Sequence, residues 1–82
     1  MYFEILPFLQ DLRPRVRSGA AVALGEIDDD RVKGILTNHL VNESKIDVRM
    51  AIEEALQMVQ KRKQAREAAR LDKLLKEKKR QP

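Results

Sequence analysis

The feature that most constrains this chain is an internal repeat with an offset of 32 residues. Val16-Arg17 aligns with Val48-Arg49, and small or apolar residues coincide at the positions that follow. Repeats of about 20 to 50 residues are typical of structural units that stack on one another to bury a shared core. We therefore expect two stacked copies of one unit.

Hydrophobic periodicity predicts that each unit is helical. Apolar or small residues stand at 16, 19, 20, 23, 24 and 27, and again at 48, 51, 52, 55, 56 and 59, so each set forms one stripe along a helix. Upstream, the same offset aligns the apolar residues Phe3 and Ile35. Each unit is thus a helical hairpin with an acidic turn. The expected helices lie at about 2–10, 14–27, 30–42 and 46–59.

Residues that favour helix ends support this partition. Pro14 suits a first helical turn, where its missing N–H removes no hydrogen bond. The aspartates at 28–30 are expected to cap the helix that begins near Arg31, and Ser44 or Asp47 to cap the fourth helix.

A basic segment follows the second copy. Residues 1–59 contain seven Lys or Arg and ten Asp or Glu, a net charge of −3, whereas residues 60–82 contain ten and three, a net charge of +7. No Gly or Pro stands between 60 and 81, so the fourth helix is expected to continue. The sequence therefore predicts an all-α solenoid fragment of two stacked hairpins at 1–59, then a long basic helical extension at 60–82.

A motif recurs in both copies: an acidic residue, a turn, Val-Arg, and small residues leading to Ala-Leu. In the first copy it consists of Asp11, Pro14, Val16-Arg17, Ala20, Ala23-Leu24-Gly25 and Ile27. In the second it consists of Asp47-Val48-Arg49, Ala51, Ala55-Leu56 and Val59. This motif resembles HEAT-like repeats of the phycobilisome-lyase type. The resemblance implies a non-catalytic scaffold or adaptor that binds proteins, or a bilin-lyase-like subunit that acts with a partner.

The sides of the second helices outside the predicted buried stripe form a candidate partner-binding face. In the first copy this side is small and apolar and also includes Ala21 and Gly25, whereas in the second it is acidic around one methionine. It would suit a helix or peptide with an apolar stretch and a basic residue, and the alternative is an ordinary solvated helix face. The predicted face consists of Ser18, Val22, Met50, Glu53, Glu54 and Gln57.

A second predicted set is a ladder of charges with a structural role. Its members are Asp11, Arg17, Asp47 and Arg49, with Glu43 nearby, and charge-assisted hydrogen bonds among them would hold the stacked turns in register. Binding of a phosphate by the two arginines is the alternative.

The basic extension offers a third candidate surface, which consists of Lys61, Arg62, Lys63, Arg66, Arg70 and Lys73. Nucleic acid or a ribonucleoprotein is the alternative partner. No aromatic residue stands between 60 and 82, so such binding would rest on phosphate contacts and ignore base sequence. The competing interpretation is a solvated helix end.

The sequence gives no sign of catalytic or metal chemistry, and we expect no cofactor. The chain has no Cys, and His39 is its one histidine, which predicts a surface or interface residue because zinc requires three or four ligands. The run at 28–30 lacks the Gly and distal Glu of a calcium loop. Phosphate-loop and Ser-His-Asp motifs are missing as well.

Two expectations concern the setting of the protein. No segment approaches the roughly 20 apolar residues of a membrane span, and no secretory signal is recognisable, so we expect a cytoplasmic protein. The chain begins with an apolar segment that contains Phe3, Ile5, Phe8 and Leu9, and no capping unit precedes it. Such an uncapped repeat end predicts self-association or marginal stability, and the alternative is that the chain is a fragment of a longer solenoid.

Overall fold

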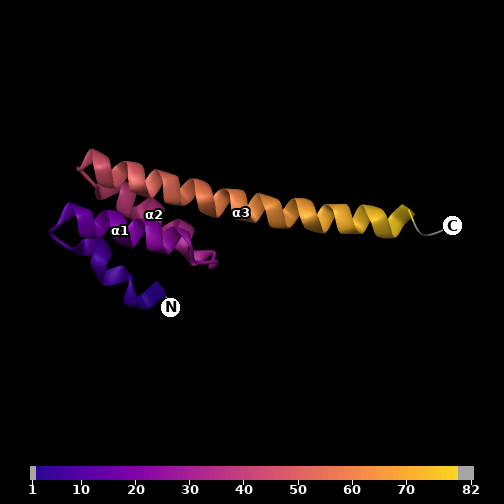
Figure 1. Ribbon diagram of the computed structural model, residues 1–82, viewed down its shortest axis with the longest axis horizontal. Coiled ribbons are helices and arrows are strands. Elements are labelled where there is room, and N and C mark those ends of the chain that lie inside the picture. The colour runs from indigo at the N-terminus through magenta and orange to yellow at the C-terminus, as the bar shows by residue number, and fades with distance from the viewer. Residues whose placement is uncertain (1, 80–82) are drawn as a thin grey trace.

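Residues 2–79, described by a computed structural model, fold into two short 3-10 helices and three α-helices (Figure 1). These are η1 (Tyr2–Glu4), η2 (Leu6–Gln10), α1 (Pro14–Gly25), α2 (Arg31–Asn42) and α3 (Ile46–Lys79). No strand occurs between residues 2 and 79, which confirms the predicted all-α fold. Residues 80–82 of the basic extension lie outside the described part.

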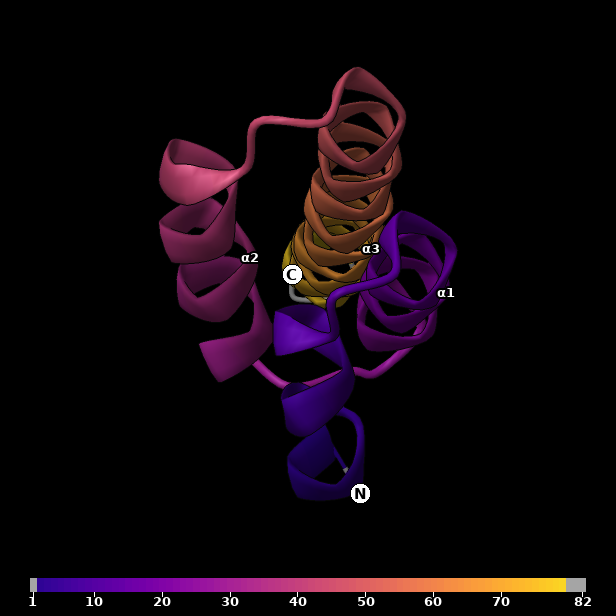
Figure 2. The same cartoon turned by 90° about the vertical axis from the view of Figure 1, so that its left-hand side faces the viewer.

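The helices are arranged as two stacked hairpins. α1 and α3 lie side by side and run in the same direction, whereas α2 runs the opposite way (Figures 1 and 2). The segment formed by η1 and η2 packs against α1, and α2 packs against α3. α1 and α3 are therefore the second helices of the two repeats.

The first segment differs from its prediction, because residues 2–10 form two 3-10 turns and not an α-helix. Pro7 explains the difference. In an α-helix over 2–10 it could not donate a hydrogen bond to Phe3, and its ring would clash with the carbonyl of that residue. Instead, the backbone N–H of Phe8 donates to the carbonyl of Ile5 at 2.9 Å.

The helix ends follow the predicted signals in part. Pro14 stands in the first turn of α1, as expected. Among the three aspartates, Asp29 accepts the backbone N–H of Arg31 at 2.9 Å. The predicted caps Ser44 and Asp47 form no side-chain hydrogen bond to the start of α3 within the described residues, and the Glu43 carboxylate accepts the N–H of Lys45, which precedes the helix, at 3.1 Å.

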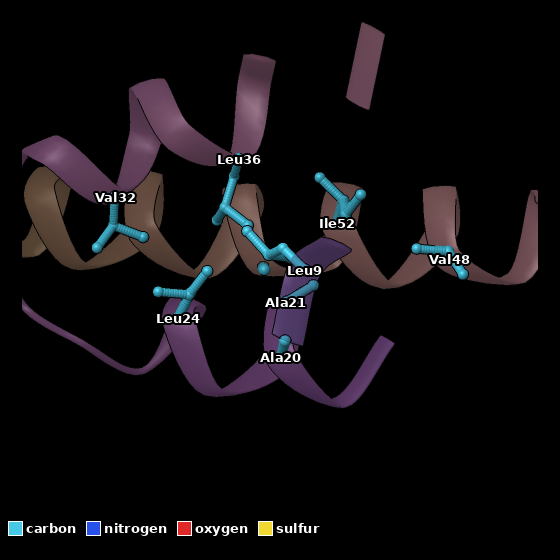
Figure 3. Close-up of a cluster of buried hydrophobic side chains, with 9 residues drawn as sticks. Leu9, Ala20, Ala21, Leu24, Val32, Leu36, Val48 and Ile52 are labelled. Atoms are coloured by element: carbon cyan, nitrogen blue, oxygen red, sulfur yellow. The ribbon is translucent and has the colours of Figure 1, made fainter. Parts of the chain in front are cut away.

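The hydrophobic core draws on η2 and on all three α-helices (Figure 3). Leu24 from α1 points toward Val32 and Leu36 from α2, with Leu9 from η2 beside them (Figure 3). Burial of each such side chain contributes about 1.5–3 kcal/mol. The buried apolar residues are Leu9, Ala20, Ala21, Leu24, Val32, Leu36, Val48, Ile52 and Ala55.

The buried side of α1 is rotated relative to the predicted stripe. Gly19 was expected inside and is exposed, whereas Ala21 and Gly25 were expected on the free side and are buried. The cause is the close approach of α3, since a Cβ built on Gly25 would lie 2.8 Å from the Cβ of Ala55. The stripe predicted for the second copy is confirmed, because its six positions are buried or half-buried.

α3 continues far beyond the two hairpins, as predicted. It has 34 residues, which at about 1.5 Å per residue gives a rod of roughly 50 Å. Its C-terminal half projects from the body (Figure 1), and the longest dimension of the molecule is 62 Å. None of the helices in the described range is long and apolar enough to cross a membrane.

Candidate functional site

A buried ion pair joins the turns of the two repeats. The guanidinium of Arg17 in α1 donates to both carboxylate oxygens of Glu43, from Nε at 2.8 Å and from Nη2 at 3.1 Å. The two side chains are only 14% and 4% exposed. Such a bidentate, charge-assisted pair fixes both the distance and the orientation of the groups that it joins.

Glu43 is the centre of a wider network. His39 Nε2 lies 3.0 Å from Oε1 of Glu43, and the backbone N–H of Lys45 donates to Oε2. Burial alone would raise the pKa of Glu43, but the hydrogen bonds from Arg17, Lys45 and His39 outweigh it and lower this pKa from 4.5 to about 2. The carboxylate is therefore ionised in the folded protein at neutral pH.

The arginines of the predicted ladder make the same bond in each repeat. Arg17 donates to the carbonyl of Asp11 at 2.7 Å, and Arg49 donates to the carbonyl of Glu43 at 2.8 Å, so each contacts the residue six positions earlier. The Asp11 carboxylate holds Arg13 instead, which lowers the pKa of Asp11 to about 2.

In the second repeat, Arg49 makes the bond to the backbone carbonyl but, within the described chain, not the bond to a carboxylate. Arg17 uses Nε and Nη2 to hold the carboxylate of the next repeat, whereas Nε and Nη2 of Arg49 have no such partner within residues 2–79. Asp47 is exposed and forms no ion pair in this range.

A groove of about 950 Å³ lies beside the network, between the N-terminal segment and α2. Arg17, His39 and Glu43 contribute to its lining, so the ion pair holds the groove walls in place. Apolar side chains and uncharged amides provide most of the remainder. The other lining residues are Phe3, Leu6, Pro7, Leu9, Gln10, Asp11, Leu12, Ile35, Asn38, Asn42 and Ser44.

Sequence reasoning missed most of this groove, and it placed His39 at a surface or interface. The His39 side chain is 11% exposed and lies in the network. The offset of 32 does align Glu43 with Asp11, which was the available signal for its importance. No sequence pattern indicated that Asn38 and Asn42 would line a groove. Their position beside the N-terminal segment depends on how that segment packs in the folded protein.

The predicted partner-binding face is only partly assembled. Met50 and Val22 are 54% and 45% exposed, and Ser18 is half-buried. Glu53 and Glu54 are exposed but consecutive, so they point about 100° apart on α3. No hydrogen bond or ion pair links the six residues within the described chain, and the face stays a prediction.

Two cations of the predicted basic surface bind the body. Arg62 donates to the backbone carbonyl of Gly25 at the C-terminal end of α1. Arg66 forms an ion pair with Asp28 at 2.8 Å. The remaining members, Lys61, Lys63, Arg70 and Lys73, are exposed. The start of the extension is therefore part of the folded structure.

We expect two truncations to separate these roles. Deletion of residues 60–82 should lower the free energy of unfolding by about 1.5–3 kcal/mol, because it removes the charged hydrogen bond to Gly25. Deletion of residues 67–82, which keeps Arg62 and Arg66, is the control, and the chain that lacks residues 60–82 should be the less stable of the two truncated chains by this amount. Urea unfolding followed by circular dichroism measures both, and equal midpoints for the two truncated chains would contradict the assignment.

The described residues contain no group of three or more His, Asp or Glu side chains placed to hold a metal ion. In comparisons with known proteins, a family model of HEAT repeats matches residues 4–57, which span both hairpins. No curated protein and no solved structure matches the chain significantly.

Proposed function

Since the chain belongs to the HEAT repeat family, we propose that it is a non-catalytic scaffold or adaptor that binds an extended segment of a partner protein in the groove between the N-terminal segment and α2. Members of this architecture stack helical units into surfaces that hold other proteins. The observation that carries the proposal is the groove of about 950 Å³ beside the buried ion pair.

The lining chemistry suits an extended peptide. Gln10, Asn38 and Asn42 offer amide donors and acceptors, which a peptide backbone requires when it is not paired in a helix or sheet. Leu6 and Leu12 provide apolar contacts for its side chains, and Leu12 is 93% exposed. A peptide there would gain both hydrogen bonds and apolar burial.

The hydrogen bonds around Arg17 and Glu43 hold the groove in a fixed shape. Arg17 ties the start of α1 to the turn after α2, and it also donates to the carbonyl of Leu12 at 3.1 Å. These bonds fix the groove before any partner arrives. A fixed groove loses less conformational entropy on binding, which improves affinity.

The test uses peptides selected from a random display library against the full chain. Asn42→Arg should weaken their binding at least about tenfold, because the larger cation fills the groove and removes an amide. Val41→Arg is the matched control, since Val41 is the neighbouring residue, is 77% exposed and does not line the groove. Titration followed by fluorescence anisotropy gives both dissociation constants.

Amide chemical-shift mapping then locates the bound peptide. Shifts confined to the N-terminal segment and α2 support the groove. Shifts confined to Val22, Met50 and Glu54 would instead support the partner-binding face between α1 and α3 and overturn the groove. Equal affinity of the two arginine variants would also contradict the proposal.

Two other roles remain predictions from the sequence. The exposed cations of α3 support sequence-blind binding of nucleic acid, which should weaken steeply as salt rises. The resemblance to phycobilisome-lyase-type repeats supports a lyase-subunit role, and assay of chromophore transfer with a partner subunit would test it.

A further inference from the structure

One side of α3 is uncovered along the whole helix. α1 and α2 flank α3 on two sides, and the side directed away from them carries no other element of the described chain (Figure 2). Positions 46, 50, 53, 57, 60, 64, 68, 71 and 75 recur there every three or four residues, and all nine are exposed. This spacing keeps them in one line on a helix.

The line is apolar at both ends and polar in the middle. Ile46 and Met50 are 72% and 54% exposed at the N-terminal end, and Leu71 and Leu75 are 60% and 61% exposed at the C-terminal end. Between them stand glutamines at 57, 60 and 64. A shallow hollow of about 360 Å³, lined by these glutamines with Leu56 and Lys61, marks the middle of the line.

The two halves of α3 also differ in charge. Residues 46–60 contain one basic and three acidic residues, a net charge of −2. Residues 61–79 contain nine basic and three acidic residues, a net charge of +6. A helix with this distribution is attracted to an identical helix that runs in the opposite direction, and it is repelled by one that runs in the same direction.

We propose that this line is the pairing surface for a second copy of the chain, with the two α3 helices antiparallel and centred near Gln60. The reversal places Ile46 and Met50 of one copy against Leu71 and Leu75 of the other. It also places the acidic half of α3 in each copy beside the basic half of α3 in the other copy. Gln57 of one copy then lies opposite Gln64 of the other, and Gln60 lies near its own counterpart at the twofold axis, where amides donate to and accept from each other.

The folded bodies leave room for this arrangement. Val48, Ile52 and Ala55 mark the buried side of α3, on which α1 and α2 pack. The pairing line lies on the opposite side, so each body faces outward from the paired helices. The surface is separate from the groove between the N-terminal segment and α2.

Sedimentation equilibrium of the full chain over a range of concentrations tests the pairing. The parent chain should show a reversible monomer–dimer equilibrium, and Leu71→Glu should raise its dissociation constant at least about tenfold. Ala69→Glu is the matched control, because it adds the same charge to the same helix about 160° around from Leu71 and outside the line, and it should leave the constant unchanged. Circular dichroism checks that both variants stay helical.

Cysteine cross-linking tests the direction of pairing, since the chain contains no Cys. Under mild oxidation, a mixture of Met50→Cys and Leu71→Cys chains should form the mixed disulfide in preference to either symmetric one. Dominant symmetric disulfides would show parallel pairing and overturn the proposal. A parent chain that stays monomeric, or equal effects of Leu71→Glu and Ala69→Glu, would overturn it as well.

Discussion

Replacement of Glu43 by alanine should lower the free energy of unfolding by about 3–5 kcal/mol, because it leaves the buried Arg17 cation without its carboxylate. A small domain has a total of only about 5–15 kcal/mol, so this loss is a large part of its stability. Urea unfolding followed by circular dichroism measures the loss. Glu54→Ala, at an exposed position outside the pairing line of α3, is the control and should change stability by less than about 0.5 kcal/mol.

A double variant distinguishes a lost ion pair from a general packing defect. Arg17→Met combined with Glu43→Leu removes both charges and keeps apolar volume, so it should be more stable than Glu43→Ala alone. If Glu43→Ala cost less than about 1 kcal/mol, or if the double variant were the least stable of the set, the network would not have its assigned role.

Acid unfolding provides a second measurement on Glu43. Its pKa of about 2 in the folded chain lies below the ordinary value of 4.5, so the unfolded chain binds this proton more readily. The stability that Glu43 contributes is therefore complete above pH 4.5 and is lost as the pH falls toward 2. Glu43→Gln should flatten this dependence, whereas the contribution of Asp11, whose pKa is also lowered to about 2, is retained in both chains.

Two glycine substitutions in α1 should have effects of opposite sign. Gly25→Ala should destabilise the fold by about 1–3 kcal/mol, because the new Cβ would lie 2.8 Å from the Cβ and 3.0 Å from the Cα of Ala55. The second contact is with backbone, so α1 and α3 would have to move apart. Thermal and urea unfolding both measure the change.

Gly19→Ala is the matched control for this close approach. A Cβ on Gly19 meets nothing within 4 Å, and alanine is favoured over glycine in a helix by about 1 kcal/mol, so this variant should be more stable than the parent. Neither glycine has a positive φ, so space and not backbone conformation separates them. Two variants that moved in the same direction would rule out a special packing role for Gly25.

Some features that the predictions missed were present in the sequence. Pro7 already excluded an α-helix over 2–10, because a proline cannot donate the hydrogen bond required there. The stripe through Ile52, Ala55 and Val59 also continues at helical spacing to Arg62 and Arg66. These two cations could thus have been expected to face the body.

The sequence by itself determined the elements and their order, since the physics behind them is local. Apolar spacing predicted α1, α2 and the first part of α3, Pro14 predicted the start of α1, and the absence of Gly or Pro after Val59 predicted the long α3. The repeat offset further predicted that two like units would stack. The helices, the start of α1 and the length of α3 each depend on residues close together along the chain.

Only the tertiary structure decided which surfaces meet and which stay open. The close packing of α1 on α3 buried Ala21 and Gly25, which helical spacing alone had left outside. The stacking of the two repeats made Glu43, and not another acidic residue nearby, the partner of Arg17. It also brought together segments that are distant in the sequence to form the groove. The physical reason is that contacts between helices depend on their separation and rotation, which periodicity within one helix does not specify.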